Sequence, residues 1–387
     1  MKMIQKKRLS LVFVLVMVFI MAACSGNNDN KAGESVPPLS EEGTSPAVGE
    51  TANADTSEAE KQNIIVTDQY GREITIEGPV ERILCMQHHT LDIILELQAQ
   101  DLVVGTMNSW ENLLGSYIRD IFPEIDDLPK PGEMKEYNIE EVMALEPDVI
   151  FASNQIPEDT LTQLEKFGIP VIVITLYKAD REQASTIAPE LINPDEAYTE
   201  GLKQTIEIIA EVTGKEERGQ ELWDYVVTNR QIVADHLETV PEDKRILVYM
   251  ANEDMYTYGT GKYVGVAMEK AGAKNVAETI KGYQQVTIEQ IIEWNPEVIF
   301  VQSRYAEVLD EIQEDERWAS IDAVKKGNLF IAPDYTKPWG NPAPESIALG
   351  ELWLAKTLYP DTFEDVDLDE MVSYFYSHFY GIEYTAK

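Results

Sequence analysis

Two stretches of the chain repeat the same order of polar and apolar residues. NIEEVMALEPDVIF occupies residues 138–151, and TIEQIIEWNPEVIF occupies residues 287–300. Each copy opens with a polar residue that can cap a helix, continues with apolar residues at helical spacing, and reaches a proline followed by Val-Ile-Phe. A proline stops a helix, and a short all-apolar run is typical of a strand covered on both faces of a parallel sheet. Each copy therefore predicts a helix that leads into a buried strand.

The segments on either side of the two copies also follow one another in the same order. ERILCMQHHTLDIILELQAQDLVVGT precedes the first copy and KRILVYMANEDMYTYGTGKYVGVAMEKAGAKNV precedes the second, and both predict a strand, a loop and a helix. LTQLEKFGIPVIVIT and VLDEIQEDERWASIDAVKKGNLFIAP follow the copies, and each predicts a helix and a further strand. Helices that alternate with buried strands form α/β units. The sequence therefore predicts an α/β fold with two Rossmann-like lobes whose central sheets are mostly parallel.

A helical connection lies between the two predicted lobes. Asn193 and Pro194 provide a cap and a first-turn proline, and the helix that they start should end near Gly214. A second helix, from about 215 to 237, would be roughly 33 Å long at 1.5 Å per residue, which is enough to cross from one lobe to the other. The expected division is an N-terminal lobe at 63–214, one long interlobe helix at 215–240 and a C-terminal lobe at 241–387, with the ligand cleft between the lobes.

The first residues of the chain predict export. Four basic residues precede the apolar run LSLVFVLVMVFIMAAC, which is too short for a comfortable membrane span and is typical of a signal peptide at 1–23. The small residues before Cys24 resemble a bacterial lipobox, in which the cysteine becomes lipidated, and an ordinary secretory signal with a chance cysteine is the alternative. Residues 24–62 are rich in Ser, Gly, Pro and acids, and they predict a flexible tether. The protein is expected at the extracytoplasmic face of the cell membrane, held there by the lipid alone.

Composition narrows the range of partners and activities. The formal net charge of -38 makes nucleic acid and anionic lipid poor partners. Only two cysteines occur, and Cys85 lies in a strand-like apolar run, so it should be buried and inert and no disulfide framework is expected. The sequence contains no G-x-S-x-G, H-E-x-x-H or P-loop motif, so we do not expect an enzyme. An exported enzyme or a sensor partner on the same scaffold stays an alternative.

Four stretches together resemble one known family. They are VTDQYGREITIEGPVERIL, then NIEEVMALEPDVIFAS with GIPVIVI, then Thr213-Gly214-Lys215-Glu216-Glu217 before the long helix, and finally TIEQIIEWNPEVIFVQ. In this order they are similar to the helix-linked (class III) substrate-binding proteins of ABC importers, a group that receives ferric siderophores, haem and cobalamin. The resemblance implies a monomeric receptor without a resident cofactor. It would capture an iron complex, either a ferric siderophore or haem, and deliver it to a permease dimer with its ATPase subunits; cobalamin is the alternative ligand.

The resemblance also implies a role for one glutamate in each repeated segment. In this family a surface glutamate on each lobe docks into the permease dimer, and the matching positions are Glu140 and Glu289. Both should lie at the second position of a helix, where the helix dipole favours a carboxylate. The alternative is that both are ordinary surface acids.

Candidate ligand residues lie where the predicted strands end. Ligands of open α/β sheets gather beyond the carboxyl ends of the strands, which here face the cleft. The candidates from both lobes are His88, His89, Trp110, Met134, Tyr177, Tyr256, Arg304, Tyr335 and Trp339. Aromatic side chains with one arginine suggest a large, partly planar ligand with polar edges. The segment from Trp339 to Glu345 departs from the plain siderophore-binding pattern.

The histidine pair and Arg304 each leave two interpretations open. Adjacent histidines on extended backbone point to opposite sides, so at most one of His88 and His89 should face a given ion, and no zinc or manganese cage is expected. One imidazole could ligate haem iron, together with Met134 or Met86, or it could be an ordinary loop histidine. Arg304 could pair with an anionic chelate or a propionate through its planar fork, or form a surface ion pair.

Overall fold

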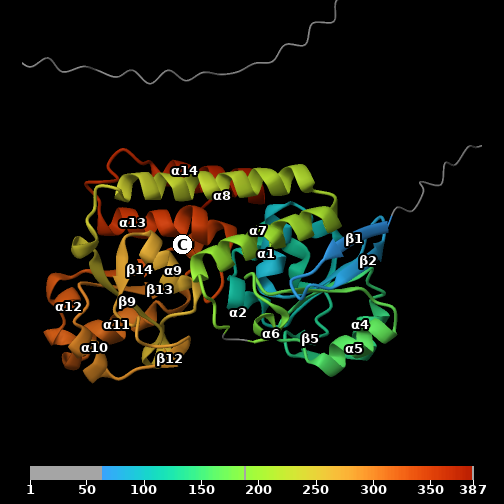
Figure 1. The fold of residues 1–387 in the computed structure, drawn as a ribbon, viewed down its shortest axis with the longest axis horizontal. Helices are drawn as coiled ribbons and strands as arrows, with labels where there is room; N and C mark the ends of the chain where they lie inside the picture. Colours follow the sequence, from blue (N-terminus) through green and yellow to red (C-terminus); the bar gives the residue numbers. More distant parts are fainter. Residues whose placement is uncertain (1–62, 187–188, 386–387) are drawn as a thin grey trace, which may run out of the picture. The chain divides into compact units, whose positions relative to one another are not determined.

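The computed structural model describes residues 63–186 and 189–385, which form two α/β lobes side by side (Figure 1). The predicted signal peptide, the tether and Cys24 lie outside the described residues. Within the described ranges, no helix combines the length and the apolar character needed to cross a membrane.

Each lobe is built on a four-stranded parallel sheet, and the two sheets have the same strand order. The first sheet runs β4-β3-β7-β8 and the second runs β11-β9-β13-β14. The strands of the first are β3 (Ile83–Met86), β4 (Val103–Thr106), β7 (Val149–Ser153) and β8 (Val171–Ile174). Those of the second are β9 (Ile246–Ala251), β11 (Ala273–Asn275), β13 (Val298–Gln302) and β14 (Leu329–Ala332). The repeated segments thus supply matching central strands of two separate sheets, which confirms the predicted fold class.

Helices and short hairpins surround the two sheets. The first lobe carries α1 (His88–Glu96), α2 (Trp110–Leu114), α3 (Ile118–Ile121), α4 (Ile139–Ala144), α5 (Glu158–Lys166) and α6 (Arg181–Ala184). The second lobe carries α9 (Tyr263–Lys270), α10 (Ile288–Trp294), α11 (Glu307–Glu314) and α12 (Asp322–Lys326). The antiparallel pairs are β1 (Asn63–Thr67) with β2 (Glu73–Glu77), β5 (Gly132–Glu133) with β6 (Glu136–Tyr137), and β10 (Tyr256–Tyr258) with β12 (Tyr283–Gln285).

The two repeated helices, α4 and α10, begin at the predicted caps. Thr287 forms a full capping box, in which its hydroxyl accepts from the Gln290 N–H at 3.3 Å and its N–H donates to the Gln290 side chain at 2.9 Å. The Asn138 side chain accepts from the Glu141 N–H at 3.3 Å. The Asn138 N–H, however, donates to the carbonyl of Pro131 at 2.7 Å, so the Glu141 carboxylate accepts from the Asn138 side-chain amide instead. Both starts were predicted correctly.

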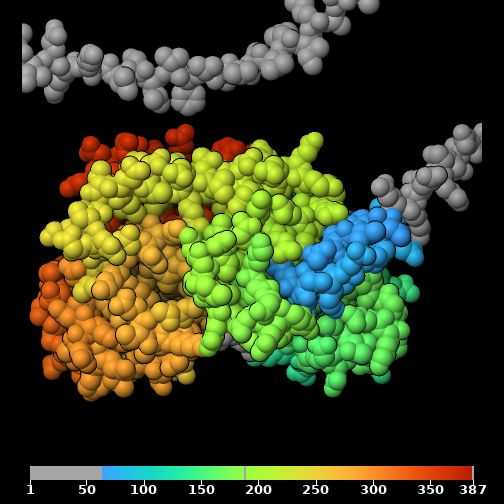
Figure 2. Space-filling model, viewed as in Figure 1, coloured from blue at the N-terminus to red at the C-terminus, as the bar shows by residue number. Residues whose placement is uncertain are grey.

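Two long helices join the lobes. They are α7 (Pro194–Thr213), which ends at Gly214 in the left-handed conformation, and α8 (Glu216–Leu237), which runs across the top of both lobes (Figure 1). Figure 2 shows the surface of α8 in yellow above the orange C-terminal lobe and the green and blue N-terminal lobe. The later helices α13 (Glu351–Leu358) and α14 (Leu368–Phe375) lie beside α8. The stiff connection between the lobes is therefore a layer of helices that includes the predicted long one.

The C-terminal end of the chain reaches back to the first lobe. The short helical turn η9 (Tyr376–Tyr380) packs against α1. Arg218 on α8 ties the two together, since its guanidinium donates to the carbonyls of Glu96 and Phe379, both at 3.0 Å. Cys85 on β3 is fully buried, and burial raises the pKa of its thiol to about 12, so it stays protonated, as an inert core residue would.

Gly201 provides a test of how α7 is seated on the first lobe. A β-carbon at this position would lie 2.2 Å from the Cα of Tyr177, and the Gly201 carbonyl accepts from the Gln69 side chain at 2.7 Å. We expect Gly201→Ala to lower the free energy of unfolding by about 1–3 kcal/mol through overpacking, although alanine favours a helix by about 1 kcal/mol over glycine. Chemical denaturation, monitored by circular dichroism, measures this change in the free energy of unfolding.

The neighbouring Glu200 is exposed on the same helix, so Glu200→Ala serves as the control for helix propensity alone. A Gly201→Ala variant as stable as the wild type would contradict the close approach of α7 to Tyr177.

Candidate functional site

The histidine pair forms the first turn of α1, directly after β3. The rings of His88 and His89 lie 4.1 Å apart between centroids, so both occupy one side of the helix start. The prediction that they point to opposite sides was wrong, because it assumed extended backbone. Successive residues of a helix are separated by about 100° around its axis, which keeps two neighbouring rings together.

Trp339, from the other end of the chain, covers this pair. Its ring lies edge-on to His88 at 5.6 Å and to His89 at 5.2 Å between centroids, and its side chain is buried. Trp339 follows β14 through the turn η7 (Asp334–Thr336), so it belongs to the second sheet's carboxyl edge while the histidines belong to the first's. The structure therefore brings together three of the predicted ligand residues from both lobes.

Arg304 adds a positive charge to this group. It lies in η5 (Ser303–Tyr305), directly after β13, with its guanidinium 5.1 Å from the centre of the Tyr305 ring. Its Nε atom is buried and has no hydrogen-bond partner among the described residues. Tyr258 lies near Arg304. Burial raises the pKa of the Tyr258 hydroxyl, and the positive charge of Arg304 opposes this rise. A buried guanidinium donor without a partner is costly, so a ligand that accepts from it would be favoured.

The two imidazoles are neutral at neutral pH. Burial, together with the smaller effects of the positive charges of Arg304 and Lys337, lowers the pKa of His88 to about 3. Burial likewise holds the pKa of His89 well below its usual range. The Nδ1 atom of His88 is buried without a partner in the described part of the chain. The backbone of Asn341 lies close enough to His89 to oppose the fall in its pKa, although neither ring nitrogen of His89 meets the distance and angle limits of a hydrogen bond to a described residue. These rings can therefore donate N–H groups to a ligand.

The structure does not bring the other aromatic candidates to this group. Trp110 is buried in the core of the first lobe, with the Arg119 guanidinium 4.9 Å from its ring centre. Tyr177 is buried, and its hydroxyl donates to the carbonyl of Thr186 at 2.8 Å. Tyr335 is buried as well. The Tyr335 ring lies edge-on to that of Tyr384 at 5.7 Å between centroids. All three side chains therefore contribute to packing within the protein.

The last two candidates lie elsewhere in their lobes. Met134 is half-buried in the turn between β5 and β6, where its sulfur accepts from the Gln155 side chain at 3.9 Å. Tyr256 is exposed on β10 and stacks on Tyr283 at 5.1 Å between centroids. Neither makes a described contact with the histidine pair.

Sequence reasoning missed a buried ionic cluster behind the histidine pair. Its centre is Lys337, whose ammonium contacts the carboxylates of Asp92 and Glu345 and donates to the Tyr380 hydroxyl at 2.9 Å. Glu96, one helical turn after Asp92, lies in the same cluster, and all of these side chains are buried. A signal was present, because Asp92 and Glu96 are two carboxylates at helical spacing in the otherwise apolar residues 91–96 of α1.

The pKa shifts of the four ionisable groups indicate which of them are charged. Burial and the Glu345 charge raise the pKa of Asp92 to about 6, and burial raises that of Glu96 well above its usual range. Although burial opposes it, Lys337 holds the pKa of Glu345 below its ordinary value. In turn, the two carboxylates raise the pKa of Lys337 against the effect of burial. The raised pKa of Glu96 thus favours its protonated form beside the charged Lys337 and the carboxylates of Asp92 and Glu345.

The carboxylates could be mistaken for a metal site. Oxygens of Asp92, Glu96 and Glu345 lie within 4.8 Å of one another, a spacing that could hold a metal ion. The ammonium of Lys337, however, already bonds two of the three carboxylates. The positive charge that these acids require is therefore supplied by the chain itself.

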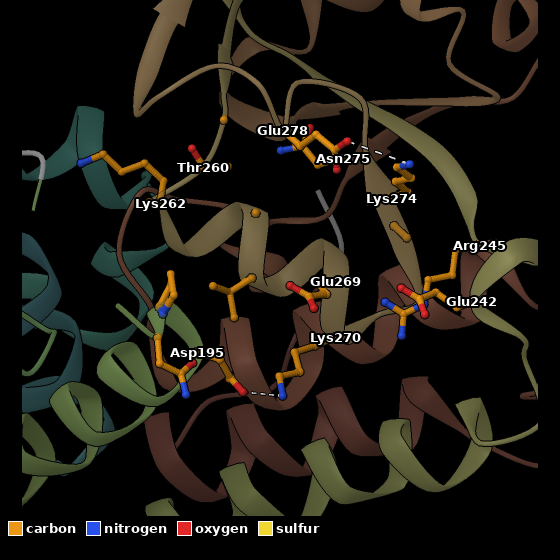
Figure 3. A pocket seen from close by; sticks show the side chains of 17 residues that line it. Asp195, Glu242, Arg245, Thr260, Lys262, Glu269, Lys270, Lys274, Asn275 and Glu278 are labelled. Carbon is orange, nitrogen blue, oxygen red and sulfur yellow. Dashed lines mark ion pairs between the residues drawn. The ribbon is translucent and has the colours of Figure 1, made fainter. Parts of the chain in front are cut away.

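A separate pocket of about 610 Å³ lies between the start of α7 and the C-terminal lobe (Figure 3). Its charged lining comprises Asp195, Glu242, Glu269, Glu278, Arg245, Lys262, Lys270 and Lys274. Asp195 pairs with Lys270 at 2.5 Å, and Lys274 with Glu278 at 3.9 Å. The Lys262 side chain points away from the other charged groups, toward the first lobe. Acids and bases are balanced here, so this pocket does not favour an anion or a cation as the histidine site does.

Comparison with known proteins identifies the family. A family model described as periplasmic binding protein matches residues 83–336. The chain is 46% identical over 322 residues to the molybdate-binding protein MolA of Haemophilus influenzae, which covers 83% of this chain and 92% of the relative. It is 24% identical over 310 residues to the ABC transporter substrate-binding lipoprotein YvrC of Bacillus subtilis, covering 78% of this chain and 87% of YvrC.

A solved structure of Haemophilus influenzae MolA bound to molybdate is also similar. It superposes with a TM-score of 0.81 and 45% sequence identity, and the match covers 84% of this chain and 99% of MolA. The predicted iron complex, siderophore or haem, with cobalamin as its alternative, was therefore wrong: a relative this similar over most of both chains binds molybdate. The resemblance to the helix-linked group described the shared scaffold, which binds ligands of several kinds.

The remaining expectations about family and activity agree with these matches. The relatives are substrate-binding proteins of ABC transporters, so the chain is a binding protein and not an enzyme. The matched segment contains both repeated helix-strand units and the two long connecting helices. With a family model over more than half of its length and a relative of 46% identity, this chain belongs to the periplasmic binding protein family.

Proposed function

We propose that the protein captures a tetrahedral oxyanion of the molybdate type outside the cytoplasm and delivers it to an ABC permease. The relative with 46% identity binds molybdate, and this is the first support. The second is chemical: the residues that meet between the lobes are hydrogen-bond donors in a buried place. The single observation that carries the proposal is that the buried Nε of Arg304 and Nδ1 of His88 have no hydrogen-bond partner among residues 63–186 and 189–385.

This set of donors suits a small dianion better than a chelate. Molybdate carries two negative charges and four oxygens that accept hydrogen bonds and donate none. The planar fork of Arg304 can bind two of these oxygens at once, and neutral imidazoles can donate one N–H each to the others. Because the site is withdrawn from water, each of these charge-assisted hydrogen bonds is stronger than on the surface.

Glu140 and Glu289 remain our candidates for contacts with the permease. Each is exposed at the second residue of its repeated helix, α4 or α10. Hydrogen bonds from its own backbone N–H and from Thr287 lower the pKa of Glu289, so its carboxylate is charged and held near the helix start. Two fixed negative groups at equivalent places on two similar lobes would suit a permease with two similar halves.

We also propose that Cys24 carries the lipid anchor. The support is the basic, apolar and small-residue order that precedes it, together with the relative YvrC, which is a lipoprotein. The acidic and Ser-, Gly- and Pro-rich residues 25–62 would then tether the binding lobes to the membrane.

Arg304→Gln tests the oxyanion site directly. Because the substitution removes the charged fork but keeps a polar side chain, we expect the molybdate dissociation constant to rise by about tenfold to a thousandfold, the loss of about 1.5–4 kcal/mol of charge-assisted hydrogen bonding. Isothermal titration calorimetry measures this. Arg317→Gln is the matched control, since Arg317 is an exposed arginine on the same lobe that pairs with Asp315. Equal affinity in the wild type and Arg304→Gln would overturn the assignment.

The low pKa of His88 predicts a pH dependence of stability. The folded protein leaves this ring unprotonated down to about pH 3, whereas the unfolded chain binds a proton below about 6.5. Between these values the unfolded state holds more protons, so the free energy of unfolding should fall as the pH falls through this window. His88→Gln should make that decline shallower. Denaturation at several pH values measures the slope.

The ring resonances of His88 give a second readout of the same group. In the ligand-free protein they should not titrate between pH 5 and 8. Added molybdate should raise the pKa of His88, because a nearby dianion favours the protonated ring. Free-protein resonances that titrate near pH 6.5 would contradict the buried, neutral state.

The permease contacts predict a separation of transport from binding. Glu140→Gln with Glu289→Gln should reduce molybdate uptake into proteoliposomes that contain the cognate transporter, while the dissociation constant of molybdate stays unchanged. Exposed ion pairs contribute roughly 0.2–1 kcal/mol each, so we expect a severalfold loss at limiting receptor concentration. Glu158→Gln with Glu307→Gln changes two other exposed first-turn acids and serves as the control. Undiminished uptake by the first pair would remove the docking role.

A further inference from the structure

Lys337 lies two residues before the tryptophan that covers the histidine pair. The backbone N–H of Trp339 donates to the Lys337 carbonyl at 2.7 Å, and Lys337 itself adopts the left-handed conformation with φ of 36°. Its ammonium lies 5.6 Å from the centre of the Trp339 ring, within the range of a cation–π contact. The position of Trp339 therefore depends on Lys337 through both backbone and side chain.

The ammonium of Lys337 is itself fixed from two sides. Asp92 holds it from α1, the same helix whose first turn carries the histidine pair, and Glu345 holds it from the segment that follows Trp339. All three side chains have no exposed surface. The contacts close a ring that runs from the histidines along α1 to Asp92, across to Lys337, on to Trp339, and back to the histidines.

Stability alone does not account for such a cluster. Replacing a buried ion pair by apolar groups of similar volume is often neutral or stabilising, so a core at this place needs no lysine. What buried, hydrogen-bonded charges provide is a fixed position, because any displacement leaves a charge without its partner. Here Asp92 lies one helical turn after the histidine pair, and Lys337 lies two residues before Trp339.

We propose that Lys337 is a positioning residue of this site: anchored by Asp92 and Glu345, it holds the Trp339 indole against the histidine pair, so that the oxyanion meets a preformed wall. The ligand in this statement rests on the proposed function above. The positioning itself can be observed without any ligand. Preorganisation raises affinity because the side chains that contact the ligand are already ordered before binding.

The test uses two variants and one matched control. Lys337→Met removes the cation, and the triple variant Lys337→Met, Asp92→Asn, Glu345→Gln also removes the acids that would otherwise stay buried without a partner. Glu351→Gln breaks another buried ion pair, in which Arg230 binds Glu351 at 2.7 Å on α8 and α13. Each protein is labelled with 5-fluorotryptophan, and the Trp339 line is assigned with Trp339→Phe.

Two quantities are measured: the ¹⁹F line of Trp339 without ligand, and the dissociation constant of molybdate by calorimetry. We expect both Lys337 variants to broaden or split the Trp339 line and to bind molybdate about tenfold more weakly, equivalent to about 1.4 kcal/mol. Glu351→Gln should change neither, even where it lowers stability. The triple variant separates positioning from folding, because it leaves no uncompensated charge.

An unchanged Trp339 line or an unchanged dissociation constant in the triple variant would overturn the proposal. An equal loss in Glu351→Gln would also overturn it, since the effect would then come from general destabilisation. If the wild type itself fails to bind molybdate, the proposed ligand falls, and the ¹⁹F line still decides whether Lys337 positions Trp339.

Discussion

A lysine ammonium buried among carboxylates fixes the place where the two lobes meet. Lys337 and Asp92 are 245 residues apart in the chain, yet they share a contact that water does not reach. A buried charge without a partner costs several kcal/mol, so a motion that separated these groups would be strongly opposed. The contact therefore opposes any separation of the lobes at this place. The layer of helices α7, α8 and α13 also opposes separation of the lobes, because the helix α8, which runs across both lobes, resists bending more than a pair of connecting strands would.

The fold was predictable because its determinants are local and occur twice. A cap, a helical run, a proline and an apolar strand can each be identified within a few residues, and their repetition predicted two sheets with equivalent centres at β7 and β13. The side chains of Asn138 and Thr287 cap their helices as predicted, since each accepts a hydrogen bond from the backbone N–H three residues later. The order of the strands was not predicted; the structure shows that it is the same in both sheets.

The site was less predictable because it depends on contacts between distant segments. His88, His89, Arg304 and Trp339 were found from their positions after strands, and the structure places them in one group. Tyr177 occupies an equally suitable position in the sequence, but its hydroxyl is bonded to the carbonyl of Thr186, and nothing local signals that bond. Lys337 was missed because a single lysine in a loop is ordinarily exposed. Only the tertiary structure shows that Asp92, Glu345 and Tyr380 surround it.

The proposed ligand depends on few atoms, whereas the family resemblance depends on many. The repeated segments and long helices are shared by receptors for several ligands, so they carry no information about which one is bound. In the proposed function, selection falls to the Arg304 guanidinium and two neutral imidazoles, where the buried Arg304 Nε and His88 Nδ1 have no hydrogen-bond partner in the described part of the chain. A chain of net charge -38 repels anions at long range, but at physiological ionic strength that repulsion is screened beyond about 8 Å. Inside the proposed site screening is weak, so the local charge of Arg304 would outweigh the distant surface acids and favour an anion there.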